Sequence, residues 1–332
     1  MFTIAEIGQA HEGSLGIAHS YIDALADTGV DAVKFQTHLA DAESSVHEPF
    51  RVKFSYEDPT RYNYWKRMEF NLNQWKELKK HCDDKGVEFI SSPFSNSAVD
   101  ILEEVGVQRY KIGSGEVNNH LLLRKIAETG KPIILSSGLS SFDELANTLE
   151  FLDAWDNEVS ILQCTTAYPT SPEQWGLNLI QELKDRFGKK VGFSDHSGDI
   201  TACIAASMAG AQIFEFHAVF DKRLFGPDSK ASLTMEQISS LINHLKRVEI
   251  AKTTTGDKNI TPEKEKLKSI FEKSLAVNRD IKKGERISFD ILEGKKPKGF
   301  GIDAEKFNSV IGKRVTKDLG KWDFLTEDMI SE

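Results

Sequence analysis

Short β-favouring runs alternate with segments of helical periodicity from the N-terminus to about residue 250. The β-favouring runs begin at Phe2, Val30, Val87, Arg109, Pro132, Val159, Lys190 and Gln212. Apolar residues at helical spacing fall between them, in residues 15–27, 72–84, 97–105, 121–128, 142–152, 178–186, 200–209 and 235–248. Ser141 and Glu144 have the spacing of a capping box at the start of one such segment.

Eight strand–helix pairs in residues 1–250 predict a (β/α)₈ TIM barrel. An open, doubly wound sheet is the alternative. It is disfavoured because no Gly-x-Gly-x-x-Gly motif follows the first strand.

Two regions depart from this alternation. Residues 38–69 form a long polar and aromatic insertion, which predicts an ordered wall built with Tyr56, Tyr62, Tyr64 and Trp65. The composition turns polar in residues 251–270, which predicts a linker that is partly helical. Short strands and turn signals in residues 271–332 predict a small β-rich domain, near the lower size limit for an independent core.

Composition narrows the class of protein. Of 332 residues, 39% are hydrophobic and 28% charged, as in ordinary globular proteins. The net charge of −9 argues against a nucleic acid or an anionic membrane as partner. Three scattered cysteines form no disulfide framework, which favours a reducing cytoplasm. We find no signal peptide near Met1 and no apolar run of the ~20 residues that span a bilayer.

Polar residues gather where the predicted strands end, which is where a barrel carries its chemistry. Residues 110–116 combine Lys111, two glycines flanking Ser114, and Glu116. The lysine, the hydroxyl and close backbone N–H groups suit a phosphate, whereas the carboxylate suits a second reactant. Lys34 from the second strand adds a second cation. The arrangement predicts binding of a phosphorylated acid.

His196 and His217 end neighbouring strands of the predicted barrel. Two imidazoles with positions left for water, substrate oxygen and a carboxylate suit a catalytic Mn²⁺, Fe²⁺, Co²⁺ or Zn²⁺ ion. The implied reaction joins a phosphate-bearing anion to a metal-polarised carbonyl. Cys164, with no base nearby in the sequence, is interpreted as a core residue.

Six motifs in the same order resemble the sialic (nonulosonic) acid synthase family, which condenses phosphoenolpyruvate with an N-acylated aldohexose. They are Ala-Glu-Ile-Gly with His-Glu-Gly-Ser in residues 5–14, Val-Lys-Phe-Gln-Thr in 33–37, residues 110–116, Gly-Phe-Ser-Asp-His in 192–196 and Gly-Pro-Asp in 226–228. Residues 272–330 resemble the family's antifreeze-like (SAF) domain, so the resemblance covers nearly the whole chain.

The resemblance implies a role for each candidate residue. Phosphoenolpyruvate would be held by Lys34, Ser92, Lys111, Ser114, Ser136, Thr166 and Ser194. The metal, usually Mn²⁺ with Mg²⁺ or Co²⁺ as alternatives, would be bound by His196 and His217. The open-chain sugar would face Glu6, Gln36, Tyr168 and Asp228. Glu116 would lie between the reactants and transfer a proton, and Glu6, Lys111 and Tyr168 join it as candidate catalytic residues.

Three departures from the family pattern are expected to bear on the sugar. Lys296 stands where an arginine contacts the N-acyl group, often in the neighbouring subunit of a domain-swapped homodimer. Gln163 replaces a histidine, and Phe216 replaces a basic residue. The acceptor is therefore left open between N-acetylmannosamine, its 6-phosphate, and a deoxy or diacetamido hexose that leads to a legionaminate- or pseudaminate-type product.

Two other functions remain open at this point. A metal-dependent pyruvate aldolase or lyase on a similar barrel would use pyruvate and would need the two lysines less. A non-enzymatic carbohydrate-binding or ice-binding protein is suggested by the tail alone. The convergence of polar residues on the barrel, which the tail lacks, argues against the second of these.

Overall fold

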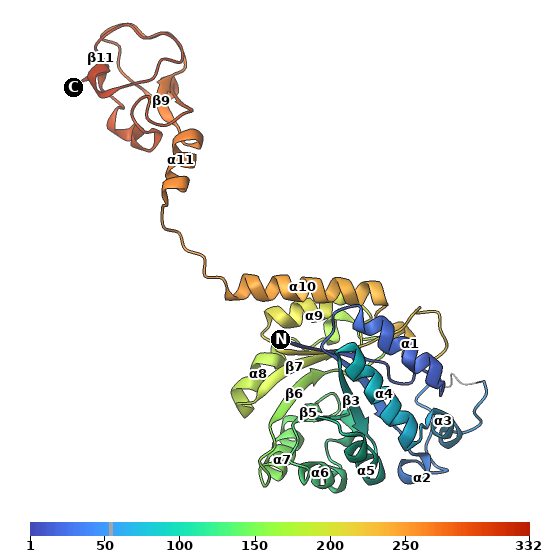
Figure 1. Cartoon of the computed structure of the whole chain (residues 1–332). Helices are drawn as coiled ribbons and strands as arrows, with labels where there is room; N and C mark the ends of the chain where they lie inside the picture. The colour runs from blue at the N-terminus through green and yellow to red at the C-terminus, as the bar shows by residue number, and fades with distance from the viewer. Residues whose placement is uncertain (53–55) are drawn as a thin grey trace. The chain divides into compact units, whose positions relative to one another are not determined.

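The structure, a computed structural model, describes residues 1–52 and 56–332. Eight parallel strands follow one another around a closed barrel, and β8 pairs with β1 to complete it (Figure 1). The strands are β1 (Phe2–Glu6), β2 (Ala32–Thr37), β3 (Glu88–Pro93), β4 (Tyr110–Ile112), β5 (Ile133–Ser136), β6 (Val159–Cys164), β7 (Lys190–Asp195) and β8 (Ile213–His217). The predicted TIM barrel is confirmed, and the open-sheet alternative is wrong.

Helices cover the outside of the barrel. They are α1 (Leu15–Ala26), α4 (Leu72–Lys85), α5 (Asn96–Val105), α6 (His120–Ala127), α7 (Phe142–Leu152), α8 (Asn178–Phe187), α9 (Ile200–Met208) and α10 (Met235–Thr253). The capping box predicted for α7 is present, because the Ser141 and Glu144 side chains each bond the other's backbone N–H. Helix α10 continues five residues beyond the predicted 248.

Side-chain alternation along the strands separates two cores. Residues pointing outward pack against the helices in the main core. Residues pointing inward close the barrel floor, in a cluster made of Ile4, Ala32, Ile90, Ile134, Leu162 and Ile213. Gly192 is required inside the barrel, because a Cβ there would lie 2.4 Å from the Ile213 carbonyl oxygen and 2.5 Å from a Leu162 methyl.

The described part of the insertion after β2 contains two helices, α2 (Ala40–Glu43) and α3 (Arg61–Met68). Tyr64 and Trp65 are buried in a small cluster with Ala40 and Met68, so an ordered aromatic wall is confirmed for these two aromatic residues. Tyr56 is 96% exposed and lies outside that wall, which corrects the prediction. Residues 53–55 of the predicted insertion lie outside the described residues.

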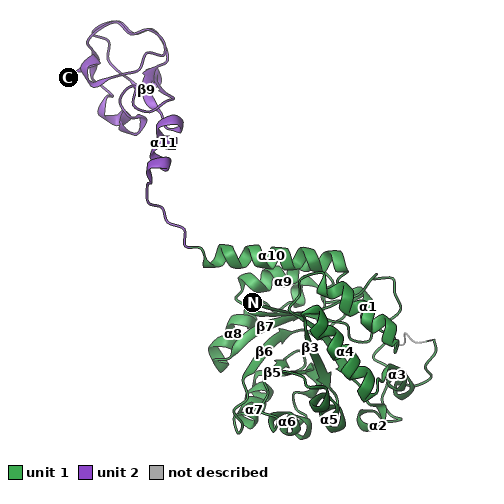
Figure 2. Cartoon of the chain, in the orientation of Figure 1, with its two compact units in different colours: residues 1–254 green, residues 255–332 purple. Residues whose placement is uncertain are grey.

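The chain divides into two compact units, residues 1–254 and 255–332 (Figure 2). The second unit contains α11 (Pro262–Phe271) and two antiparallel pairs, β9 (Ser274–Val277) with β10 (Leu292–Lys295) and β11 (Arg314–Val315) with β12 (Ile330–Ser331). It has its own core, which includes Val277, Val310 and Leu325. The small β-rich tail is confirmed, and its antifreeze-like identity stays a prediction.

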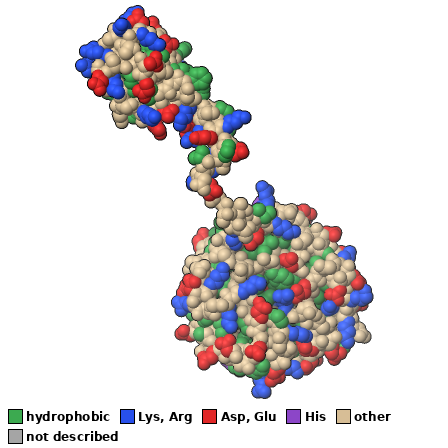
Figure 3. Space-filling model, turned by 60° about the vertical axis from the view of Figure 1, so that its left-hand side comes forward, with side chains coloured by type: hydrophobic (Ala, Val, Ile, Leu, Met, Phe, Trp, Pro, Cys, Tyr) green, Lys and Arg blue, Asp and Glu red, His purple; other side chains and the backbone are tan. Residues whose placement is uncertain are grey.

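Acidic and basic side chains are interspersed on both units in the face drawn in Figure 3, with no large area of one sign. Among the described residues, no helix combines the length and the apolar character needed to cross a membrane.

Candidate active site

Two neighbouring cavities lie at the carboxyl ends of the barrel strands. The inner cavity has a volume of about 190 Å³ and the outer cavity about 380 Å³. Five residues line both of them: Gln36, Phe94, Thr166, Tyr168 and His217. The two cavities therefore meet along a shared wall, as a site for two reactants requires.

The inner cavity follows from the period of two along each strand. Directly above the apolar floor, the next inward residue on each of several strands is polar. Ile4 is followed by Glu6, Ile134 by Ser136, and Ile213 by Glu215. The same step leads from Ala32 to Lys34, from Ile90 to Ser92 and from Leu162 to Cys164.

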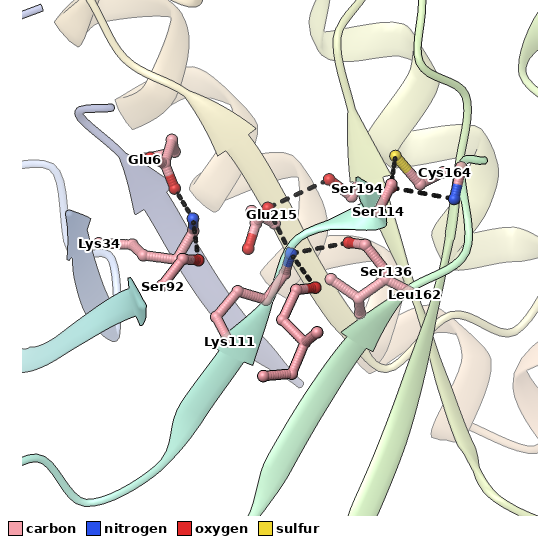
Figure 4. A network of polar contacts seen from close by, with 12 residues as sticks. Glu6, Lys34, Ser92, Lys111, Ser114, Ser136, Leu162, Cys164, Ser194 and Glu215 are labelled. Atoms are coloured by element: carbon pink, nitrogen blue, oxygen red, sulfur yellow. Dashed lines mark hydrogen bonds and ion pairs between the residues drawn. The ribbon is translucent and has the colours of Figure 1, made fainter. Parts of the chain in front are cut away.

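Lys34 forms one half of the cation pair in the inner cavity (Figure 4). Its ammonium contacts the carboxylate of Glu6 and donates to Ser92 Oγ at 3.3 Å. Burial lowers the pKa of Lys34 to about 7, although the Glu215 carboxylate opposes this shift. The direct contact with Glu6 also favours the charged ammonium.

Lys111 forms the other half. Its ammonium donates to Ser136 Oγ at 2.7 Å and to the Ile112 carbonyl at 3.2 Å, and it lies 3.4 Å from Glu215 Oε1 (Figure 4). Ser194 Oγ donates to the same carboxylate oxygen at 3.2 Å. Burial alone raises the pKa of Glu215, but Lys111 and Lys34 outweigh it and hold that pKa below its ordinary value. Glu215 is therefore ionised between the two lysines.

The loop after β4 closes this end of the cavity. It forms a single 3₁₀ turn, Ser114–Glu116. Ser114 Oγ accepts from the Gly138 N–H at 3.0 Å and lies 3.7 Å from Cys164 Sγ. A Cβ at Gly138 would lie 2.6 Å from Thr166 Oγ1 and 2.9 Å from both Ser114 Oγ and Cys164 Sγ. Glycine here lets three side chains converge on one point.

His196 and His217 lie beside each other at the shared wall, with ring centroids 5.3 Å apart. His196 Nδ1 lies 2.9 Å from the Thr165 carbonyl, which only accepts, so Nδ1 carries the proton. Its Nε2 lone pair then accepts from the Tyr168 hydroxyl at 3.0 Å. Burial lowers the pKa of both histidines to about 3, which keeps the rings neutral.

Two neutral imidazoles, one held in its Nε2-ligating tautomer by a backbone carbonyl, fit a divalent metal. The described residues contain no group of three or more histidine, cysteine or acidic side chains placed to hold an ion. Substrate and water oxygens would therefore have to complete the coordination.

The outer cavity holds the other candidate carboxylates. Glu116 lines it and accepts from Asn119 Nδ2 at 2.8 Å. Burial raises the pKa of Glu116, Asn119 opposes the rise and Glu43 adds to it. Asp228 lies opposite and accepts from Arg51 Nη2 at 2.6 Å. The guanidinium of Arg51 also covers the Tyr168 ring at 4.1 Å.

The structure brings together all but one of the candidate residues named from the sequence. The inner cavity is lined by Glu6, Lys34, Gln36, Ser92, Lys111, Ser114, Ser136, Thr166, Tyr168, Ser194, His196 and His217, and the outer cavity adds Glu116 and Asp228. Glu6 faces the inner cavity, beside Lys34, although the resemblance placed it toward the sugar. Lys296 belongs to the second unit.

Three expectations need correction. Gln163 points away from both cavities and donates to the Trp175 carbonyl at 3.3 Å. Phe216 packs in the outer core. On its strand, each of these two residues lies next to a residue that faces inward, so its own side chain faces outward. Neither therefore contacts the proposed sugar position. Cys164, expected in the core, is buried but lines the inner cavity.

Sequence reasoning left several site residues unassigned. Glu215 is two residues before His217, and the strand period alone places both on the inner face. Arg51, His38 and Glu43 belong to the insertion and line the outer cavity. The insertion lacks a repeating pattern that would have singled them out.

Comparison with known proteins gives consistent results. The NeuB family profile matches residues 21–258. The N,N'-diacetyllegionaminic acid synthase of Campylobacter jejuni is 35% identical over 330 residues, covering 98% of each chain. The human N-acetylneuraminate-9-phosphate synthase is 30% identical, covering 99% of this chain and 92% of its own. The sialic acid synthetase structure from Leptospira borgpetersenii, in complex with citrate, superposes with a TM-score of 0.71 at 29% identity, covering 80% of this chain and 89% of its own.

Proposed function

This chain belongs to the NeuB family, and we propose that it condenses phosphoenolpyruvate with an N-acylated aldohexose to form a nonulosonic acid. The observation that carries this function is the pair of adjoining cavities. One contains two buried lysines and hydroxyl donors, the other is lined by carboxylates, and the candidate metal ligand His217 belongs to both.

Phosphoenolpyruvate binds in the inner cavity. The charges of Lys34 and Lys111 are balanced there by Glu6 and Glu215, so the cavity carries little net charge before substrate arrives. The hydroxyl groups of Ser92, Ser114, Ser136 and Ser194, together with Thr166 Oγ1, supply neutral donors around the same space. The Thr166 hydroxyl is buried and has no hydrogen-bond partner among the described residues, which suits a bound anion.

The acceptor in the outer cavity is an uncharged N-acylated hexose, either N-acetylmannosamine or a diacetamido-trideoxyhexose. Arg51 is paired with Asp228 at 2.6 Å, and Arg61 lies 3.4 Å from Glu48. Glu43 and Glu116 add two further carboxylates to this wall. Because each guanidinium already has a carboxylate partner, a sugar 6-phosphate would meet excess negative charge.

His196 and His217 hold a divalent ion, for which Mn²⁺ is proposed and Mg²⁺ or Co²⁺ are alternatives. When bound, such an ion supplies Lewis-acid polarisation of the sugar aldehyde. Tyr168 packs against the His196 ring with centroids 4.1 Å apart, and Arg51 covers the Tyr168 ring in turn.

The reaction forms one carbon–carbon bond. The methylene carbon of phosphoenolpyruvate attacks the aldehyde carbon, and positive charge develops at the carbon that bears the phosphate. Water adds to that carbon, and phosphate leaves with the bridging oxygen. The proton released from water balances the proton gained by the aldehyde oxygen. Glu116 handles this proton, because it borders the acceptor cavity and has no place among the phosphate-binding hydroxyls.

Phosphate release tests the function. The enzyme is incubated with Mn²⁺, phosphoenolpyruvate and a panel of N-acyl hexosamines, diacetamido hexoses and their 6-phosphates. Phosphoenolpyruvate carrying a heavy bridging oxygen should deliver that isotope to inorganic phosphate. Release of unlabelled phosphate with the label in the sugar acid would rule out carbon–oxygen cleavage. An aldolase would use pyruvate and release no phosphate at all.

Assembly as a domain-swapped homodimer is part of the proposal, with Lys296 from one tail completing the site of the other subunit. Mixing inactive Lys296→Ala and Glu116→Gln proteins after subunit exchange should regenerate about a quarter of the sites. No recovery in verified mixed dimers would contradict the swap. The three cysteines are free and buried, which supports a reducing, cytoplasmic location.

A further inference from the structure

The imidazole of His38 is enclosed on both faces in the wall of the outer cavity. Its ring stacks on Trp65 with centroids 3.7 Å apart and planes 17° apart, and on Phe94 at 4.5 Å and 11°. Only the ring edges remain for polar contacts. Nδ1 lies 2.6 Å from Glu43 Oε1, and Nε2 lies 2.9 Å from Gln36 Oε1.

The neighbours of Gln36 determine where the protons lie. Glu6 contacts the Lys34 ammonium through Oε2 and accepts from Gln36 through Oε1 at 3.0 Å, so the Gln36 group that faces Glu6 is the NH₂. The amide oxygen of Gln36 therefore faces Gln9 and His38. Because an amide oxygen only accepts, His38 Nε2 must carry a hydrogen.

The hydrogen-bond capacity of Gln36 is almost fully used. Its oxygen accepts from Gln9 Nε2 and His38 Nε2, which fills both lone pairs. One of its two N–H groups donates to Glu6. Among the described residues the second N–H has no acceptor, and the Gln36 side chain lines both cavities.

We propose that His38 is a positioning residue for Gln36. Because His38 occupies the amide oxygen, Gln36 can act toward a substrate only as a hydrogen-bond donor. By holding the Gln36 oxygen, His38 turns the free amide N–H toward the acceptor, where it recognises a sugar oxygen. An acceptor with a hydroxyl or carbonyl oxygen at this point is favoured over one with a hydrogen or an amine there. This inference rests on the proposed function and assigns an acceptor-selecting task to the insertion.

A matched pair of substitutions tests the role of Nε2. In His38→Gln the side-chain amide can reach the position of Nε2 and donate to Gln36. In His38→Asn it reaches only the position of Nδ1. Both variants lose the same aromatic stacking. Steady-state phosphate release is measured with the best acceptor of the panel, and KM is determined separately for that acceptor and for phosphoenolpyruvate.

His38→Asn should raise the acceptor KM about tenfold and leave the phosphoenolpyruvate KM within about twofold, while His38→Gln should stay within about threefold of the unmodified enzyme. Equal effects of the two substitutions, or an equal rise in both KM values, would overturn the inference. If His38→Asn does not fold, Gln9→Glu removes the other donor and should show the same selective rise; its absence overturns the inference. If the unmodified enzyme released no phosphate with any acceptor, the proposed function would be contradicted, and this inference with it.

Discussion

The hydroxyl of Tyr168 donates to Nε2 of His196 across 3.0 Å, so a phenol occupies the lone pair that the proposed metal ion would use. His196 is fixed in this tautomer by the Thr165 carbonyl behind it. Arg51 covers the outer face of the Tyr168 ring at 4.1 Å and is itself held by Asp228. Metal binding therefore requires the phenol to give up this hydrogen bond, which couples the metal site to the acceptor wall.

Substitution of His196 and substitution of Tyr168 should have different effects on the affinity for Mn²⁺. His196→Ala removes a proposed ligand and should weaken Mn²⁺ binding by about tenfold or more. Tyr168→Phe removes a competing hydrogen bond and keeps the ring, so Mn²⁺ affinity should be unchanged or higher. Calorimetric titration of metal-stripped protein measures both. An equal loss of affinity in Tyr168→Phe would mean that the phenol itself supports the metal.

Stability and substrate binding can be separated at the buried Lys111–Glu215 pair. Lys111→Met leaves the Glu215 carboxylate without its nearest cation, and loss of one partner of a buried pair typically costs about 3–5 kcal/mol. Adding Glu215→Gln removes the stranded charge and should recover most of that loss. The phosphoenolpyruvate KM should remain raised at least about tenfold in the double variant, because the phosphate-directed cation is absent.

Chemical denaturation and steady-state kinetics on the unmodified protein and these two variants provide the comparison. If the double variant regained both stability and the unmodified KM, Lys111 would be a structural partner of Glu215 and have no part in phosphate binding.

The barrel and its inner cavity could be predicted from the sequence because both depend on local periodicity. Lys34 and Gln36 lie two residues apart on β2, and this spacing fixes the face that they share. The same rule would have selected Glu215 with His217 and turned Phe216 outward. The family pattern compared position by position carries no information on strand parity, and for that reason it does not show that Phe216 faces the outer core.

The outer wall could not be predicted in this way. Arg51 and His38 are brought to the cavity by the path of the insertion, and no repeat in residues 38–69 encodes that path. His38 becomes identifiable only from its contacts, because Trp65 and Phe94 enclose it from two separate segments. Long-range packing of this kind leaves no signal in one sequence.

The close approach at Gly138 predicts a local effect on phosphate binding. In Gly138→Ala the new methyl group would meet Thr166 Oγ1, Ser114 Oγ and Cys164 Sγ, all closer than 3 Å. These hydroxyls must shift, so the phosphoenolpyruvate KM should rise by about tenfold or more while metal affinity is kept. Gly16→Ala, with no atom within 4 Å of its new Cβ, is the control and should leave both unchanged. An unaltered KM in Gly138→Ala would remove Thr166 and Ser114 from the phosphate site.

The raised pKa of Glu116 should make activity and stability change with pH in opposite directions. Burial raises the pKa of its carboxyl, Asn119 opposes the rise and Glu43 adds to it. As a base it must be ionised, so kcat/KM should fall as the pH drops through this raised pKa. The folded protein holds the proton more tightly than the unfolded chain. Its free energy of unfolding therefore declines as the pH rises from the ordinary carboxyl pKa to the raised one.

Glu116→Gln separates the two effects. It should lower kcat by about 10²–10⁴. At pH values above the raised pKa of Glu116, it should also increase the melting temperature, because a neutral amide replaces a buried charge. Glu43→Gln is the matched control: removing a nearby negative charge should move the acid limb of kcat/KM to lower pH. Rate profiles and thermal melts over the acid and neutral range test both variants. If Glu116→Gln kept near-native turnover, the proton would have to move through another group, and Tyr168 at the shared wall would be the next to test.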